Sequence, residues 1–140
     1  MKNKLKCILL VDDDEPTNYI NQIVINRMDC AEEVVAVQSG EEALDYLKSV
    51  EDGIHQQPDL IFLDINMPAM NGWEFLEEYK HLPFHQKAKN VIVMLTTSLN
   101  PDDREKAKSY KEISEYESKP LTSEKIVRIV NQYFNGVDSV

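Results

Sequence analysis

Three short apolar runs, each ended abruptly by polar residues, constrain the fold of this chain more than any other feature. They are residues 7–11, 60–63 and 91–95. Four or five consecutive apolar residues between turn-forming residues are typical of a strand that is buried on both faces, as the strands of a parallel sheet are. The sequence therefore predicts buried parallel strands at these three places, with polar residues at their carboxyl ends.

Helical patterns separate these runs and predict the remaining elements. Ser39 and Glu42 have the spacing of a capping box, which predicts that a helix begins at Gly40. Asn100 followed by Pro101 and two aspartates predicts another helix start. The expected strands are residues 7–11, 33–37, 60–63, 91–95 and the weaker 114–118, and the expected helices are residues 17–28, 40–50, 72–81, 101–108 and 123–134.

Two of these helices have an apolar face that predicts which residues are buried. The first helix is expected to bury Ile20, Ile23, Val24 and Met28. The second is expected to bury Ala43, Leu44, Leu47 and Val50.

Strand and helix alternate five times in this prediction, with no linker or repeat between them. Strict alternation is typical of an α/β domain in which helices flank a parallel sheet, here five helices and five strands. The 140 residues suit one domain, and 42% hydrophobic with 29% charged residues is an ordinary globular composition. We therefore expect a single domain over residues 1–140, with its core at about residues 6–134 and no output domain.

Charge and cysteine content argue against several classes of function. The 25 acidic and 15 basic residues give a formal charge of -10, which repels nucleic acid and anionic lipid. Cys7 and Cys30 are too few and too isolated for a disulfide framework or a zinc site. The amino-terminal apolar run is too short for a signal peptide. We expect a cytoplasmic protein that binds neither nucleic acid nor membranes.

Reactive polar residues follow four of the five predicted strands, and they therefore lie along one edge of the sheet. Each alone has an ordinary structural interpretation, because Asp caps turns and helices, Thr ends strands and Lys beside Pro is usually solvated. Their coincidence at one edge favours a shared chemical task. They are Asp12, Asp13 and Asp14 after the first strand, Asp64 after the third, Thr96 after the fourth and Lys119 after the fifth.

The residue types indicate what that task is. Carboxylates brought together repel one another unless a cation joins them, and Mg²⁺ suits a site with few carboxylates and a phosphoryl oxygen. A carboxylate such as Asp64 can attack phosphorus and form an aspartyl phosphate when a metal and an ammonium neutralise the charge on the transferring group. Lys119 would supply the ammonium, and Thr96 a hydroxyl donor.

At these residues the chain resembles the receiver domains of two-component response regulators, of the stand-alone chemotaxis-regulator type. The match runs in register over about residues 6–133, nearly the whole chain. The segments that carry it are Asp12-Asp13 after ILLV, Asp64 in FLDINMPAMNG, Thr96 in VIVMLTTS, and Lys119-Pro120 preceded by Tyr116.

The resemblance implies a flavodoxin-like doubly wound sheet with strand order 2-1-3-4-5. It also implies that Asp64 accepts a phosphoryl group from a histidine kinase or phosphotransfer protein. Asp12, Asp13, Asp64 and the backbone carbonyl of Asn66 would hold Mg²⁺, one of the first two through water. Which of Asp12, Asp13 and Asp14 ligate the metal directly stays open at this point.

The resemblance further implies a switch. Lys119 would pair with the phosphoryl group, and Pro120 would follow a cis peptide bond. The Thr96 hydroxyl would move toward the phosphoryl oxygen and Tyr116 would turn inward, which changes the surface of the fourth helix, fifth strand and fifth helix that an unknown downstream protein reads. Such a chain is a phosphoacceptor and not an enzyme, beyond its own phosphorylation from small phosphodonors and its own dephosphorylation. It would be a monomer or a phosphorylation-dependent homodimer.

Three alternatives compete with this interpretation. A receiver-like scaffold that is never phosphorylated could retain the same residues. A metal-dependent phosphatase that forms an aspartyl phosphate is disfavoured. Dehalogenase-like enzymes of that class carry a DxD motif whose second Asp acts as acid and base, and this chain has Asn66 at that position. A flavodoxin-like cofactor binder is disfavoured because no Gly-rich or Ser/Thr-rich loop follows the first strand.

Overall fold

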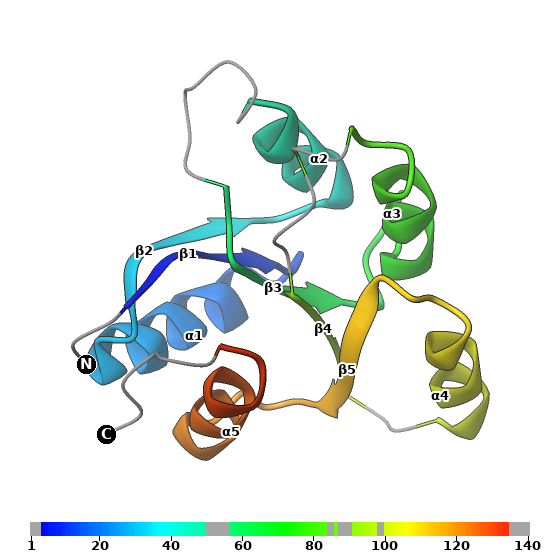
Figure 1. The fold of residues 1–140 in the computed structure, drawn as a ribbon. Coiled ribbons are helices and arrows are strands. Elements are labelled where there is room, and N and C mark those ends of the chain that lie inside the picture. Colours follow the sequence, from blue (N-terminus) through cyan, green and yellow to red (C-terminus); the bar gives the residue numbers. More distant parts are fainter. Residues whose placement is uncertain (1–3, 50–56, 84–85, 87–90, 98–99, 135–140) are drawn as a thin grey trace.

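The computed structural model describes residues 4–49, 57–83, 86, 91–97 and 100–134, and strands and helices alternate along them (Figure 1). The strands are β1 (Leu5–Val11), β2 (Ala31–Val37), β3 (Leu60–Asp64), β4 (Val91–Thr96) and β5 (Ile113–Ser118). The helices are α1 (Glu15–Met28), α2 (Gly40–Ser49), α3 (Gly72–Tyr79), α4 (Pro101–Lys108) and α5 (Ser123–Tyr133). The predicted alternation is confirmed, with ends that differ by at most two residues.

The five strands form one parallel sheet in the order β2-β1-β3-β4-β5. The predicted fold class and strand order are therefore confirmed. Because all strands run the same way, their carboxyl ends lie along one edge of the sheet, and the register pairs Asp64 with Leu95 and Thr96 with Ser118.

Helices cover both faces of the sheet, with α1 and α5 on one face and α2, α3 and α4 on the other (Figure 1). Successive residues of a strand point to opposite faces, so Leu9 and Leu10 of β1 belong to two different apolar clusters. The central strands supply side chains to both clusters, which explains why β1, β3 and β4 read as unbroken apolar runs. None of the described helices is both long enough and apolar enough to cross a membrane.

Helix α1 begins two residues earlier than predicted. Asp14 is its N-cap and accepts a hydrogen bond from the Thr17 backbone N–H at 3.1 Å, and Pro16 lies in the first turn. Both positions are favourable, because the cap satisfies a free N–H and proline lacks one. Helix α1 therefore includes Glu15 and Pro16, which lie before the predicted start at residue 17.

The buried face of α1 is also rotated from the predicted one. Ile20 was expected inside but is 57% exposed, while Asn18 and Asn21 are buried. The Asn18 side-chain amide donates to the carbonyl oxygens of Asp12, at 2.9 Å, and Val37, at 3.2 Å. The Asn18 amide thus donates to two carbonyls at the strand ends, which explains why a polar residue lies on the buried side of α1.

Helix α2 begins at Gly40 as predicted, but its capping box is only half formed. The Ser39 hydroxyl accepts from the Glu42 backbone N–H at 3.0 Å, whereas the Glu42 carboxylate accepts from the N–H of Gln38, at 3.2 Å, and not from that of Ser39. The fourth predicted inward residue, Val50, lies outside the described residues. The other three are buried as predicted: Ala43, Leu44 and Leu47.

A complete capping box occurs instead at α3, where it was not predicted. Asn71 accepts from the Glu74 N–H at 2.9 Å, and the Glu74 carboxylate accepts from the Asn71 N–H at 3.0 Å. At α4 the predicted cap is confirmed, since Asn100 accepts from the Asp102 N–H at 2.8 Å.

Candidate functional site: an acidic group with a lysine

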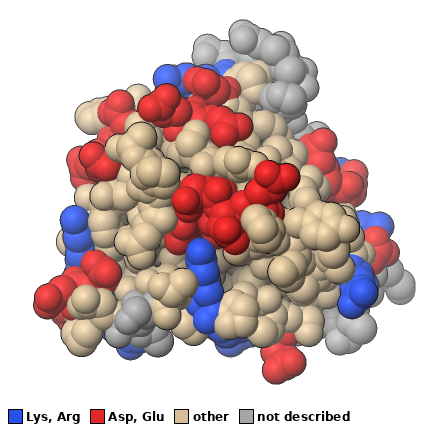
Figure 2. All heavy atoms as spheres, turned by 180° about the vertical axis from the view of Figure 1, so that it is seen from behind, with Lys and Arg blue, Asp and Glu red and all other residues tan. Residues whose placement is uncertain are grey.

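Three carboxylates meet at the carboxyl edge of the sheet. Asp12 and Asp13 follow β1, Asp64 ends β3, and one oxygen of each lies within 4.8 Å of the others. Asp12 and Asp64 are each only 4% exposed, while Asp13 faces solvent. Figure 2 shows acidic side chains gathered at the centre of one face, with basic side chains beside them. The structure thus brings together the three predicted carboxylates.

Lys119 reaches into this acidic group from the end of β5. Its Nζ lies 2.7 Å from Oδ2 of Asp12 and 3.2 Å from Oδ1 of Asp64. Its backbone N–H donates to the carbonyl oxygen of Thr96 at 2.7 Å, which ties the loop after β5 to the end of β4. The peptide bond between Lys119 and Pro120 is cis, as the family resemblance implied.

The electrostatics of the site favour an additional cation. Burial, and then the Asp12 carboxylate, raise the pKa of Asp64 from 3.8 to about 6, against Lys119 and the Asn66 backbone N–H, which lower it. Burial alone lowers the pKa of Lys119, but its contacts with Asp12 and Asp64 outweigh burial and raise it. Lys119 therefore keeps its proton, and its one positive charge only partly offsets the carboxylates.

Backbone contacts fix the acidic group from the β1 side. The Asp12 N–H donates to the carbonyl of Val37 at 3.2 Å, and the Asp14 N–H donates to Oδ1 of Asp12 at 2.9 Å. The Asp14 carboxylate points the other way and caps α1 through Thr17. Asp12 and Asp13, not Asp14, are therefore the residues of this loop whose carboxylates join Asp64.

The loop from β3 to α3 folds tightly over the end of β3. The Gly72 N–H donates to the carbonyl of Ile65 at 2.8 Å, and a Cβ on Gly72 would lie 2.8 Å from the carbonyl oxygen of Asp64. Only glycine permits this approach, so the Asn71-Gly72 pair both caps α3 and sets the path of the loop. Asn66 is exposed in this loop, and a metal-binding role of its carbonyl stays a prediction.

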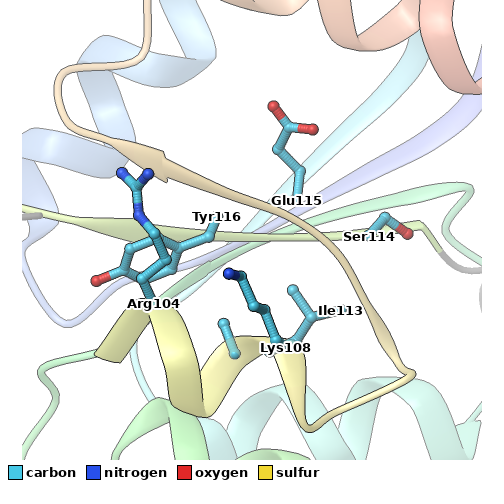
Figure 3. Close-up of a pocket in the computed structure, with 7 residues that line it drawn as sticks. Arg104, Lys108, Ile113, Ser114, Glu115 and Tyr116 are labelled. Atoms are coloured by element: carbon cyan, nitrogen blue, oxygen red, sulfur yellow. The ribbon is translucent and has the colours of Figure 1, made fainter. Parts of the chain in front are cut away.

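Thr96 and Tyr116 lie on the neighbouring strands β4 and β5. Thr96 is 2% exposed at the end of β4. Burial, and then the Asp103 carboxylate, raise the pKa of Tyr116, and the smaller opposing effects of the Asn100 backbone and Thr96 do not cancel this rise. The Tyr116 ring, on β5, lies beside Arg104 of α4 in Figure 3. The Tyr116 hydroxyl is buried and has no hydrogen-bond partner among the described residues, and the switch role of Thr96 and Tyr116 stays a prediction.

Two residues that support the site were not predicted from the sequence. Asn18 bonds to the backbone of Asp12, and Lys125 of α5 bonds to the loop that carries Lys119. The available signals were a polar residue on an apolar helix face and a lysine in the first turn of a helix, where the helix dipole disfavours a cation.

The donor set fits a hard divalent cation such as Mg²⁺. Three carboxylates supply anionic oxygen ligands, which this ion prefers, and the exposed side of Asp13 leaves room for water and a phosphoryl group. Together with Lys119, which contacts both Asp12 and Asp64, such a cation would neutralise negative charge that develops next to the Asp64 carboxylate.

Comparison with known proteins connects this geometry with a family. A model described as the response regulator receiver domain matches residues 8–131. The probable methanogenesis regulatory protein FilR2 of Methanothrix harundinacea is 30% identical over 126 residues, which are 89% of this chain and 79% of that protein. The response regulator Rcp1 of Synechocystis is 34% identical over 104 residues, 72% of this chain and 68% of that protein. The rice two-component response regulator ORR1 is 30% identical over 89% of this chain, which spans about half, 53%, of that relative's length.

Solved structures show the same similarity. A two component response regulator from Cytophaga hutchinsonii matches with a TM-score of 0.86 and 34% identity, over 95% of this chain and 99% of that one. A response regulator receiver protein from Dyadobacter fermentans matches with a TM-score of 0.80 and 25% identity, over 92% of this chain and 98% of that one.

Proposed function

This chain belongs to the response regulator receiver family, and from that premise we propose that it is a phosphorylation-controlled switch in a two-component phosphorelay. Membership confirms the resemblance found in the sequence, and the fold is the one it implied. We propose further that residues 6–134 act as one unit, with Asp64 as the phosphoacceptor.

One observation carries the assignment of Asp64. Its buried carboxylate lies 3.2 Å from the Lys119 ammonium and within 4.8 Å of oxygens of Asp12 and Asp13. A carboxylate that only caps a turn does not require a buried ammonium and two further carboxylates beside it. The donor is a phosphohistidine of a kinase or phosphotransfer protein. An Asp64 oxygen bonds to phosphorus as the bond from phosphorus to the histidine nitrogen breaks, and the imidazole then takes a proton from water.

The residues around Asp64 have separate roles in this proposal. Asp12, Asp13 and Asp64 hold Mg²⁺, with the Asn66 carbonyl as a further ligand, and the ion supplies positive charge that offsets the charge on the transferring group. One N–H of the Lys119 ammonium exchanges its acceptor on Asp12 or Asp64 for a phosphoryl oxygen. Lys119 keeps its proton and is the second positive charge beside the new aspartyl phosphate.

The output surface lies next to Tyr116. A groove of about 250 Å³ runs between α4 and β5, and its lining includes Arg104, Lys108, Ile113 and Tyr116 (Figure 3). When the Thr96 hydroxyl donates to a phosphoryl oxygen, the Tyr116 ring on the neighbouring strand repacks against α4. A downstream protein that contacts α4, β5 and α5 would then distinguish the two states. The chain itself acts as a phosphoacceptor without a catalytic output.

Incubation with Mg²⁺ and acetyl phosphate, followed by intact mass spectrometry, tests this function. We expect an acid-labile phosphoryl adduct on the wild type and none on Asp64→Asn. Asp45→Asn, which removes an exposed carboxylate from α2, is the matched control and should be modified like the wild type. A wild-type protein that stays unmodified under these conditions would favour the scaffold alternative.

A further inference from the structure

The loop that carries Lys119 is held by a second lysine. Nζ of Lys125 donates to the carbonyl oxygens of Ser118, at 2.8 Å, and Pro120, at 3.0 Å, and to the Ser118 hydroxyl at 3.3 Å. An ammonium has three N–H donors, and these three acceptors use all of them. The two carbonyls belong to the residues immediately before and after Lys119, so Lys125 clamps the backbone on both sides of the site lysine.

Lys125 occupies a position that is electrostatically unfavourable for a lysine. The N-cap of α5 is Thr122, whose side chain accepts from the Lys125 backbone N–H at 3.2 Å, so Lys125 is the third residue of the helix. The helix dipole is positive here and disfavours a cation. A residue that breaks a local rule is expected where another requirement outweighs it. Here the ammonium binds the loop carbonyls, and a Glu117 carboxylate oxygen 3.9 Å away partly offsets the dipole.

The Lys125 contacts fix the backbone from which the Lys119 side chain extends. The Lys119 N–H is already bonded to the Thr96 carbonyl at 2.7 Å, so Lys125 adds the contacts that fix the two neighbouring carbonyls. A lysine side chain has several rotatable bonds, and holding its ammonium between Asp12 and Asp64 requires a fixed backbone at its base.

We propose that Lys125 is a positioning residue that keeps the Lys119 ammonium aimed at the phosphoacceptor by binding the Ser118 and Pro120 carbonyls. The inference rests on the proposed function and extends it to a residue of α5 that does not touch Asp64. Lys125 is therefore expected to affect phosphoryl transfer only through Lys119.

Lys125→Met tests this role, because it keeps the unbranched stem and removes the three donors. In metal-free protein, hydrogen exchange at the Lys119 amide should become about ten-fold faster, as expected when roughly one hydrogen bond is lost. Amides in the middle of α5 should exchange as before. With Mg²⁺ and saturating acetyl phosphate, the phosphorylation rate constant should fall about ten-fold, while Mg²⁺ affinity changes less than about two-fold. Lys6→Met, which removes an exposed lysine paired with Glu32, is the control and should match the wild type.

A double-substitution experiment separates positioning from general support of the fold. In a Lys119→Ala background there is no ammonium to aim, so Lys125→Met should change the remaining rate by less than about two-fold. A further ten-fold loss in that background would overturn the proposal. Lys125→Gln, which retains an amide donor, should give a rate between those of wild type and Lys125→Met, and urea unfolding checks that both variants fold.

Different results would contradict the proposed function of Asp64 and the proposed role of Lys125. A wild-type protein that takes no phosphoryl group contradicts the proposed function of Asp64. An unchanged exchange rate at the Lys119 amide in Lys125→Met contradicts the clamp, whatever the phosphorylation result.

Discussion

Replacing Asp64 with Asn should stabilise the metal-free protein at neutral pH. Burial, and then the Asp12 carboxylate, raise the pKa of Asp64 from 3.8 to about 6. The folded protein therefore holds the Asp64 proton more tightly than the unfolded chain does. The contribution of Asp64 to the free energy of unfolding is therefore fully present below pH 3.8 and is lost as the pH rises through about 6.

The pKa shift sets the size of the effect. A difference of roughly two pKa units corresponds to about 3 kcal/mol of lost stability above the folded-state pKa. Relaxation of the site around the ionised carboxylate reduces this value, so we expect Asp64→Asn to gain about 1–3 kcal/mol at pH 7.5. At pH 5 the gain should be about half as large, because the folded carboxyl is then mostly protonated while the unfolded one is mostly ionised.

Urea unfolding in the presence of EDTA, at pH 7.5 and pH 5, measures this difference. Asp45→Asn, on the exposed side of α2, should change stability by less than about 0.5 kcal/mol at either pH. A destabilised Asp64→Asn protein at pH 7.5, or a gain that does not depend on pH, would refute the view that the site is electrostatically strained without a cation.

Three further outcomes follow from the site's contacts. Gly72→Ala should lose about 1–3 kcal/mol in urea unfolding, because its Cβ would meet the Asp64 carbonyl oxygen at 2.8 Å; Gly40→Ala, whose Cβ meets only a flexible methionine side chain, should lose less. Asn18→Ala should lose about 1–3 kcal/mol, because the buried carbonyl of Asp12 loses a donor at 2.9 Å, and a neutral result would contradict the bridging role. Mg²⁺ affinity measured by calorimetry should weaken below about pH 6, by up to ten-fold per pH unit, because a proton on Asp64 competes with the ion; a constant affinity down to pH 5 would contradict Asp64 as a ligand.

Those parts of the fold that depend on burial could be predicted from the sequence. Strands buried on both faces must be apolar throughout, so β1, β3 and β4 are visible as apolar runs. Because the strands are parallel, Asp12, Asp64 and Lys119 must lie at one edge of the sheet, and this can be predicted without any distances. The meeting of these three side chains follows from topology, which is why it could be anticipated.

The parts that depend on individual hydrogen bonds could not be predicted. Apolar spacing placed Ile20 on the buried side of α1, but that side carries Asn18, whose amide donates to the carbonyls of Asp12 and Val37. Capping patterns likewise suggest which residues can cap a helix and not which backbone N–H they choose, as Glu42 illustrates by accepting from Gln38. The role of Lys125 depends on the path of a loop that only the folded chain defines.

The central claim is that Asp64 is the residue that carries the phosphoryl group, and mapping the modified residue tests it most directly. Protein treated with Mg²⁺ and acetyl phosphate is reduced with borohydride, which converts an aspartyl phosphate to homoserine, and is then digested for peptide mass spectrometry. We expect homoserine at position 64 alone, and none in Lys119→Ala protein treated for the same short time. Modification at Asp12 or Asp13 with position 64 unchanged would contradict it.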